Sequence, residues 1–225
     1  MAERRGREKP RGTLARARPQ VPGQTLTTDA FVIERRPPAD SFQTYLLFSP
    51  EHGNLLALQR VPKKSSPTHV SPDLFDELTA MLESSNQGRT WFVKEVRIVA
   101  RRTGIGASYD ALRFASALVA VVGRNPVHEE SREAVGKLLR VALDSFAAGA
   151  RPDAVYLKSL YLFARDEGYP VKQEWLPSLG DDERVAAAMV LNTRAADLSL
   201  AKGTVAQIRD SLEAYLGSST EIIIP

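Results

Sequence analysis

Cysteine is absent from the 225 residues. Its absence excludes disulfides, thiol nucleophiles, iron–sulfur clusters and any zinc site built on cysteine. Histidine is scarce, and His52, His69 and His128 are too far apart in sequence to indicate a metal site. We therefore expect no cofactor. A reducing, cytoplasmic location fits such a chain.

Long apolar runs are also absent. The run Ala117–Val122 is far shorter than the roughly 20 residues that cross a membrane. The basic opening, residues 1–24, is not followed by the apolar stretch of a secretory signal. The sequence therefore predicts a soluble protein with no membrane partner.

Motifs of known catalytic sites are missing as well. The chain has no G-x-S-x-G and no H-E-x-x-H pattern. Gly104-Ile105-Gly106 lacks the third glycine or the Gly-Lys-Ser/Thr of a phosphate loop, and we expect it to join a strand to a helix. The acids Asp181-Asp182-Glu183 open a predicted helix, where they favour its positive end over a metal site. We therefore do not expect an enzyme.

Charge is distributed unevenly. Residues 1–20 hold seven Lys or Arg and two Glu, a net charge of +5. Residues 1–102 carry a net +6 and residues 103–225 a net −3. Residues 1–24 combine like charges with prolines, so they are predicted to be a disordered basic tail. The asymmetry fits a nucleic-acid partner or a solvated tail, and charge alone favours neither.

Residues 25–103 have the texture of short β-strands. Turn residues separate segments rich in β-branched and aromatic side chains, and a break near Glu95 predicts a bulge. One segment, Leu74–Leu82, also fits a helix. Five segments predict a small antiparallel barrel or a sandwich. They are Ala30–Arg35, Phe42–Phe48, Asn54–Val61, Leu74–Leu82 and Thr90–Ala100.

Residues 104–225 change to helical periodicity, with apolar residues at i, i+3 and i+4. Gly149 and Gly168 end two predicted helices, and Pro152 begins one. The fold class is therefore α+β, with a β-barrel followed by an all-α domain. The predicted helices are Tyr109–Val122, Glu129–Ala148, Ala154–Glu167, Asp181–Leu200 and Val205–Leu216.

Basic residues of the β half gather at strand ends and loops. Such side chains can follow a phosphate backbone while aromatic residues stack on bases. Phe42, Tyr45 and Trp91 are candidates for stacking, although a core position is favoured for Trp91. Taken singly, each cation fits a solvated surface as well as a DNA contact. The predicted DNA-binding set is Arg35, Arg36, Arg60, Lys63, Lys64, Arg89, Lys94, Arg97, Arg101 and Arg102.

Three segments together resemble the bacterial recombination mediator RecO. Thr28–Lys64 has that family's extended opening with basic residues, followed by a turn, Ser49-Pro50-Glu51-His52-Gly53, similar to its "T-P-E-H-G". Val93–Arg97 is similar to the end of the family's barrel, and Tyr156–Tyr169 with the following proline to its late helix. The ordered set covers roughly residues 28–217.

The resemblance implies an OB-fold followed by a helical domain, and a role in DNA repair. RecO proteins bind single- and double-stranded DNA, anneal complementary strands, and with RecR help the recombinase to displace single-strand-binding protein. Many carry a four-cysteine zinc module after the late helix. Here the chain runs from Tyr169 through VKQEWLPSLGDDE without cysteine, so we expect a short loop in place of the module.

The favoured interpretation is a non-enzymatic accessory protein that neutralises phosphates on two strands and so allows them to pair. An OB-fold RNA-binding module is the alternative among nucleic-acid binders. A structural interaction protein whose basic tail adds solubility, and an enzyme of unrecognised kind, are the other classes.

A first prediction concerns metal. Because the chain has no cysteine and its histidines are scattered, the purified protein is expected to contain no stoichiometric zinc. Elemental analysis measures this directly, and one zinc per chain would contradict the loss of the zinc module.

A second prediction concerns the basic tail. Deleting residues 1–24 is expected to leave the fold intact and to weaken DNA binding, because fewer counterions are released. Affinity measured across salt concentrations should fall with a shallower slope. An unchanged affinity and slope would show that the tail does not contact phosphate.

Overall fold

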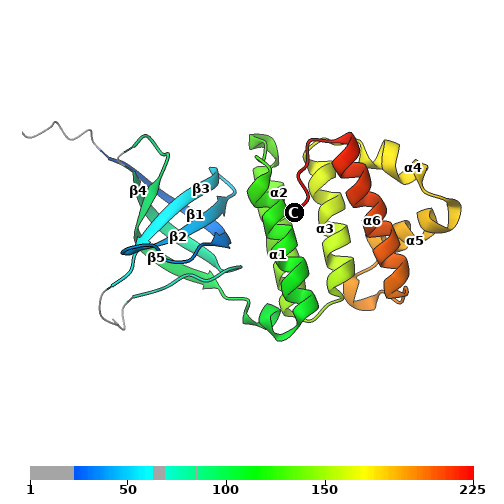
Figure 1. The fold of residues 1–225 in the computed structure, drawn as a ribbon, viewed down its shortest axis with the longest axis horizontal. Helices are drawn as coiled ribbons and strands as arrows, with labels where there is room; N and C mark the ends of the chain where they lie inside the picture. Colours follow the sequence, from blue (N-terminus) through cyan, green and yellow to red (C-terminus); the bar gives the residue numbers. More distant parts are fainter. Residues whose placement is uncertain (1–22, 63–68, 85) are drawn as a thin grey trace, which may run out of the picture.

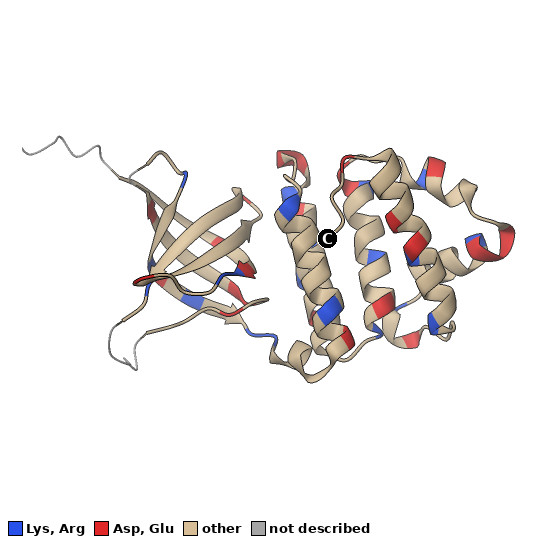
Figure 2. Ribbon diagram, viewed as in Figure 1, with Lys and Arg blue, Asp and Glu red and all other residues tan. Residues whose placement is uncertain are grey.

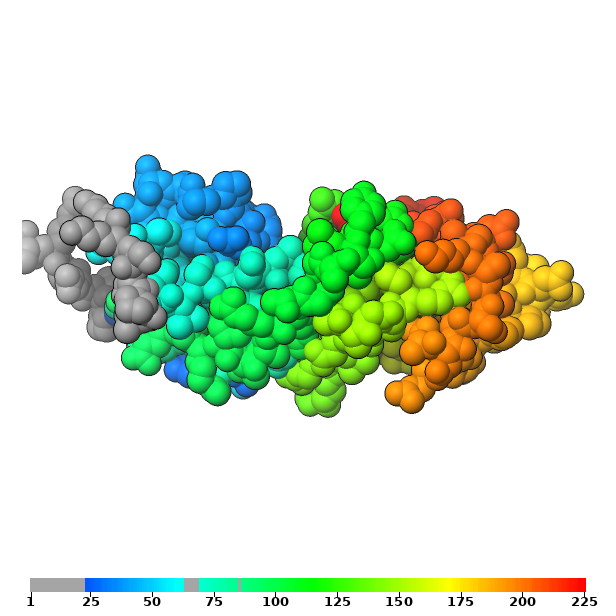
Figure 3. All heavy atoms as spheres, turned by 90° about the horizontal axis from the view of Figure 1, so that it is seen from below, coloured from blue at the N-terminus to red at the C-terminus, as the bar shows by residue number. Residues whose placement is uncertain are grey.

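A β-barrel and a helical bundle pack end to end in the computed structural model, which describes residues 23–62, 69–84 and 86–225 (Figure 1). Helices α1 (Tyr109–Arg124) and α2 (Arg132–Ala147) lie beside the barrel, and the remaining helices lie beyond them. The space-filling view shows the two halves in contact along an elongated molecule (Figure 3). The α+β class is therefore confirmed. The predicted basic tail lies almost entirely outside the described residues.

The barrel is closed in the order β1-β2-β3-β5-β4, the five-stranded OB arrangement. All neighbouring strands are antiparallel except β3 and β5, whose parallel ladder consists of two residue pairs, Ala57–Trp91 and Leu58–Phe92. The structure thus selects the barrel over the sandwich. The strands are β1 (Gln24–Arg35), β2 (Phe42–Ser49), β3 (Gly53–Arg60), β4 (Glu77–Ser84) and β5 (Trp91–Ala100).

Strand pairing changes two of the sequence predictions for the barrel. β1 begins at Gln24 rather than Ala30, because its first residues pair with β4, starting with Gln24 opposite Ser84. The ambiguous segment is a strand, since β4 pairs with β1 on one side and β5 on the other. Those ladders satisfy its backbone polar groups and override its helical spacing. The bulge near Glu95 is confirmed by a register shift between Val93 and Glu95.

One predicted helix is too long. α5 (Asp181–Asn192) ends well before Leu200, because Thr193 and Arg194 are extended. The Asn192 side-chain amide donates to the carbonyl of Ala188 and closes the last turn. A short turn, η4 (Ala195–Asp197), then directs Leu198 into the core. The other helices are α3 (Pro152–Asp166), α4 (Leu176–Ser178) and α6 (Lys202–Ser219). No helix in the described part of the chain is long and apolar enough to cross a membrane.

The segment expected to be a short loop is a compact helical turn. It comprises η3 (Val171–Trp175), which is π-helical, and α4. Trp175 is fully buried, and its Nε1 donates to Ser211 Oγ at 3.2 Å. The turn therefore anchors α6 against the rest of the bundle.

The helices cover the outer side of β1 and of the last part of β2. Phe31, Ile33 and Phe48 belong to the helical core rather than to the barrel interior. The joint at Gly104 is confirmed as a turn, η1 (Thr103–Ala107), between β5 and α1. A Cβ on Gly104 would clash with the carbonyl oxygen of Ala147, so the close packing of this joint on the end of α2 requires glycine.

Four charged side chains tie the barrel to α2, and we call them the junction clamp: Glu77, Arg102, Arg140 and Asp144. Arg102 donates to Glu77 Oε2 at 2.9 Å and to Asp144 Oδ1 at 2.7 Å. Arg140 donates to the other oxygen of Glu77 at 2.6 Å. Both guanidiniums also lie over the Phe31 ring, 5.8 and 5.7 Å from its centroid. The clamp therefore fixes the position of the bundle on the barrel.

The junction clamp generates a prediction about stability and pH. Burial acts to raise the pKa of Glu77, but the hydrogen bonds from Arg140 and Arg102 outweigh it and hold that pKa below its usual value. A lowered folded-state pKa gives stability that is present above the unfolded-state pKa and lost as the pH falls. Glu77→Gln is expected to lower the free energy of unfolding at neutral pH by about 3 kcal/mol, because the two arginines lose the buried carboxylate between them and Arg102 keeps only the exposed Asp144 as a partner.

Urea unfolding of both proteins at neutral pH and at acidic pH checks this. The difference between wild type and Glu77→Gln should shrink as the pH falls through the carboxylate range. A difference that stays constant with pH would mean that the ionised carboxylate does not stabilise the junction.

Candidate nucleic-acid interface

The side of the barrel that the helices leave uncovered is formed by β2, β3 and the start of β5, and we call it the outer face. Tyr45, Leu47 and Ala57 point into the barrel, so the residues that alternate with them point outward. Register places Phe42 opposite Arg60 and Thr44 opposite Leu58. The outer face consists of Phe42 and Thr44 of β2, Leu56, Leu58 and Arg60 of β3, and Phe92 of β5, and it ends at Leu46, which packs against the helical core.

Two phenylalanines form the aromatic part of the outer face. The rings of Phe42 and Phe92 meet edge to face, with centroids 5.9 Å apart and planes at 65°. Phe92 is 36% exposed and Phe42 is half-buried, so both offer surface on which a base can stack. The sequence pattern singled out Phe42 but missed Phe92. Strand alternation could have found it, because an inward Trp91 implies an outward Phe92.

The other two predicted stacking residues are in the core. Tyr45 is 1% exposed and Trp91 is 8% exposed, and both pack in the barrel interior. The Tyr45 hydroxyl lies within hydrogen-bonding distance of Gln59 Oε1 and of the carbonyl of Pro72. Burial raises the pKa of Tyr45. Stacking by Tyr45 is therefore wrong, since no base can reach its ring, and the core position favoured for Trp91 is confirmed.

The end of β1 and the turn that follows it carry two of the predicted phosphate contacts. Arg35 pairs with Asp73 at 3.4 Å, and Arg36 pairs with Glu34 at 2.9 Å. Both side chains remain about half exposed, at 43% and 51%. Because a guanidinium has five donors, each retains N–H groups for a phosphate, at the cost of a partly neutralised charge.

Arg60 and Arg89 are the predicted contacts that the structure leaves most available. Both are exposed, and neither has an acidic partner among the described residues. Arg60 lies at the end of β3, on the outer face. Arg89 follows a turn that is ordered by Ser84 Oγ, which accepts from the backbone N–H of Gly88 at 3.0 Å. These two guanidiniums are the strongest candidates for phosphate binding.

Three further predicted residues, on β5 or directly after it, are bound by side chains or carbonyls of β4 and of the segment that precedes β4. Lys94 pairs with Glu83, and Arg97 donates to Thr79 Oγ1 at 3.4 Å, both on β4. Arg101 lies 3.9 Å from Asp76 and donates to the carbonyl of Ser71. The structure therefore does not bring these cations together with Arg60 on one surface.

Arg102 requires a correction. Its side chain is 3% exposed and it belongs to the junction clamp, so its guanidinium is not available to a phosphate. The sequence placed it at a strand end, where cations are usually solvated, but the bundle covers that end of β5. Lys63 and Lys64 lie outside the described residues.

Charge on the barrel is nearly balanced. Residues 23–102 contain ten Lys or Arg and nine Asp or Glu, and Figure 2 shows both signs spread over the strands and loops. The excess positive charge of the N-terminal half therefore resides in residues 1–20. The outer face therefore offers aromatic and apolar surface with only a small excess of cations on the barrel that carries it.

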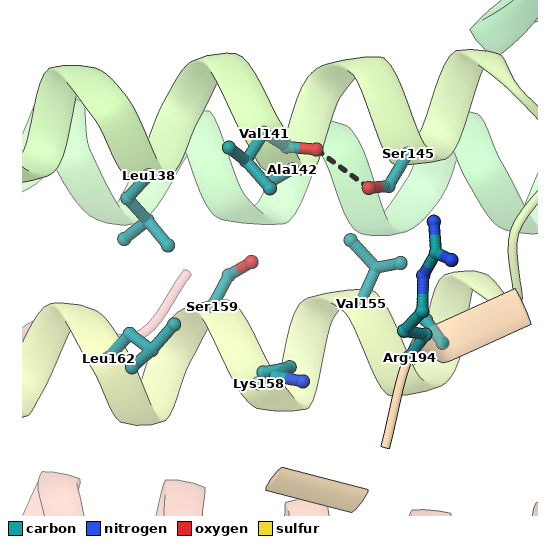
Figure 4. A pocket seen from close by; sticks show the side chains of 10 residues that line it. Leu138, Val141, Ala142, Ser145, Val155, Lys158, Ser159, Leu162 and Arg194 are labelled. Carbon is teal, nitrogen blue, oxygen red and sulfur yellow. Dashed lines mark hydrogen bonds between the residues drawn. The ribbon is translucent and has the colours of Figure 1, made fainter. Parts of the chain in front are cut away.

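The bundle carries a groove of about 320 Å³ between α2 and α3 (Figure 4). Leu138 and Val141 of α2 face Val155 and Leu162 of α3, and Arg194 lies at one end. Val141 is 66% exposed, which leaves an apolar wall open to solvent. Lys158 also lines the groove and donates to the carbonyl of Thr193.

The described residues contain no group of three or more potential metal ligands. His52 is next to Glu51, and His128 pairs with Glu167 at 2.8 Å in a separate part of the molecule.

A scan against models of protein families and a search of curated proteins both find no match to this chain.

Proposed function

We propose that this protein binds single-stranded DNA on the outer face and acts as a non-enzymatic accessory protein of DNA repair and recombination, in the manner of RecO. One observation carries the proposal. The solvent-facing pair of Phe42 on β2 and Phe92 on β5, with Arg60 of β3 opposite Phe42, lies on one face of an OB-like barrel. That surface and the adjoining loops are where OB-folds bind oligonucleotides.

The binding mechanism combines stacking with phosphate contacts. Bases stack on Phe42 and Phe92, each contributing about 1–3 kcal/mol. Arg60 and Arg89, with help from the half-exposed Arg36, bind the backbone between the stacked bases. Because stacking accepts every base, this interface tolerates sequence variation.

Annealing needs a second strand to approach the first. Residues 1–20 carry a net charge of +5, which is enough to neutralise several phosphates of an incoming strand. The barrel then holds one DNA strand, while the basic segment lowers the electrostatic repulsion between that strand and the incoming one. No bond is made or broken in this function, and no cofactor enters it.

The groove between α2 and α3 is the proposed docking site for protein partners. Its apolar walls, with Lys158 and Arg194 at the rim, fit a segment that carries both apolar and acidic side chains. The partners implied by the resemblance are a RecR-type protein, single-strand-binding protein and the recombinase.

A binding titration with a fluorescent thymidine oligonucleotide tests the outer face. Phe42→Ala and Phe92→Ala are each expected to weaken binding at least about fivefold, with an unchanged salt slope, because they remove stacking. Arg60→Glu is expected to weaken binding and to make the slope shallower by about 0.7, the value for one phosphate contact.

Matched controls come from the bundle. Tyr109→Ala removes a side chain that is 79% exposed on α1, and Lys172→Glu reverses an exposed charge on η3. Neither should change affinity, and circular dichroism confirms that all variants fold. If the controls lose DNA and the outer-face variants do not, the proposed site is wrong. An RNA oligonucleotide that binds more tightly than DNA would favour the RNA-binding alternative.

A further inference from the structure

A cleft of about 280 Å³ lies at the seam where the barrel meets α1. Its apolar floor includes Leu46 of β2 and Ala120 of α1. Gly123 leaves the space of the cleft open, because a Cβ there would lie 3.3 Å from the Leu46 side chain. Nothing in the sequence pattern pointed to this cleft, since its walls come from segments about 75 residues apart.

The cleft is continuous with the outer face. Phe42, Thr44 and Leu46 alternate along the outward side of β2, so a strand lying over Phe42 and Thr44 next meets Leu46. The Asn54 side chain donates to the carbonyls of Val122 and Gly123, both at 3.4 Å. This contact holds the end of α1 against β3 and fixes the width of the seam.

The rim of the cleft has the charges that a nucleotide requires. Arg124, at the end of α1, is exposed and has no acidic partner among the described residues. Glu34 of β1 also lines the cleft, and its two carboxylate oxygens accept from the Arg36 guanidinium at 2.9 and 3.4 Å. The acid is therefore neutralised by its neighbour, and its carboxylate retains lone pairs for a further donor.

We propose that this cleft takes one base of the strand bound on the outer face, with Arg124 on the adjoining phosphate. Glu34 then selects bases that carry an exocyclic amino group, because an ionised carboxylate only accepts hydrogen bonds. The strand consequently crosses from the barrel onto the bundle. This inference rests on the proposed function and adds a base preference to it.

The test compares cytidine and thymidine homopolymers of about 20 nucleotides, longer than the site of one OB-fold. The wild type is expected to bind the cytidine polymer about fivefold more tightly, from one amino contact. Glu34→Gln should abolish this preference, since an amide accepts and donates equally. Glu34→Gln also frees Arg36 from its ion pair, which changes the affinity for both polymers by the same factor. The readout is therefore the ratio of the two dissociation constants.

Two further variants test occupancy of the cleft. Ala120→Leu fills it and should lower both the affinity and the cytidine preference. Arg124→Glu should weaken both polymers equally, with a shallower salt slope. The matched controls are Ala188→Leu on the exposed side of α5 and Lys172→Glu, which should leave both constants unchanged.

The results distinguish failure of the cleft proposal from failure of the proposed DNA binding. If Phe42→Ala loses binding while the cleft variants keep the wild-type affinity and ratio, the cleft is empty and the outer face stands. A wild type without cytidine preference also overturns the role of Glu34. If the wild type binds neither polymer, the proposed function itself fails.

Discussion

The carboxylate of Glu77, held between two arginines, is the interaction on which the arrangement of the molecule depends. It lies on β4, and its partners come from the end of β5 and from α2. A buried charge is tolerated only when it is paired and hydrogen-bonded, so barrel and bundle must meet in the one orientation that supplies both guanidiniums. That orientation covers β1 and part of β2. It leaves the rest of β2, with β3 and the start of β5, open, and so determines which side of the barrel faces solvent.

The two clusters of buried residues divide the barrel's strands between two cores. Val32 and Tyr45 fill the barrel, whereas Phe31 and Phe48 pack against the helices. Strands buried on both sides lose the simple alternation of apolar and polar residues. The outer face keeps an alternation, but its outward residues include phenylalanine and leucine. Apolar side chains directed at solvent on an otherwise balanced surface suggest a ligand with flat apolar parts, as nucleobases have.

Much of this fold was predictable from local pattern. Strand and helix positions followed from periodicity, and the bulge in β5 from one break in alternation. The misses have a common cause, because they depend on residues distant in sequence. The beginning of β1 is set by β4, the end of α5 by the packing of Leu198, and the burial of Arg102 by α2. For the site, the charge distribution indicated that the basic half carries it, and the strand pattern indicated Phe42 as a stacking residue. It could not show which cations are neutralised by neighbours, nor that a cleft forms at the seam.

The parallel ladder between β3 and β5 has a consequence for dynamics. Its two residue pairs make it the least cross-linked part of the closed barrel, so local opening costs least there, and amide protons near Trp91 should exchange earliest within the sheet. Phe92 and Leu58 lie on opposite sides of that opening. A ligand in contact with both joins the two edges, and it therefore closes the barrel by mass action. Under the proposed function, DNA binding and barrel closure are therefore coupled in one equilibrium.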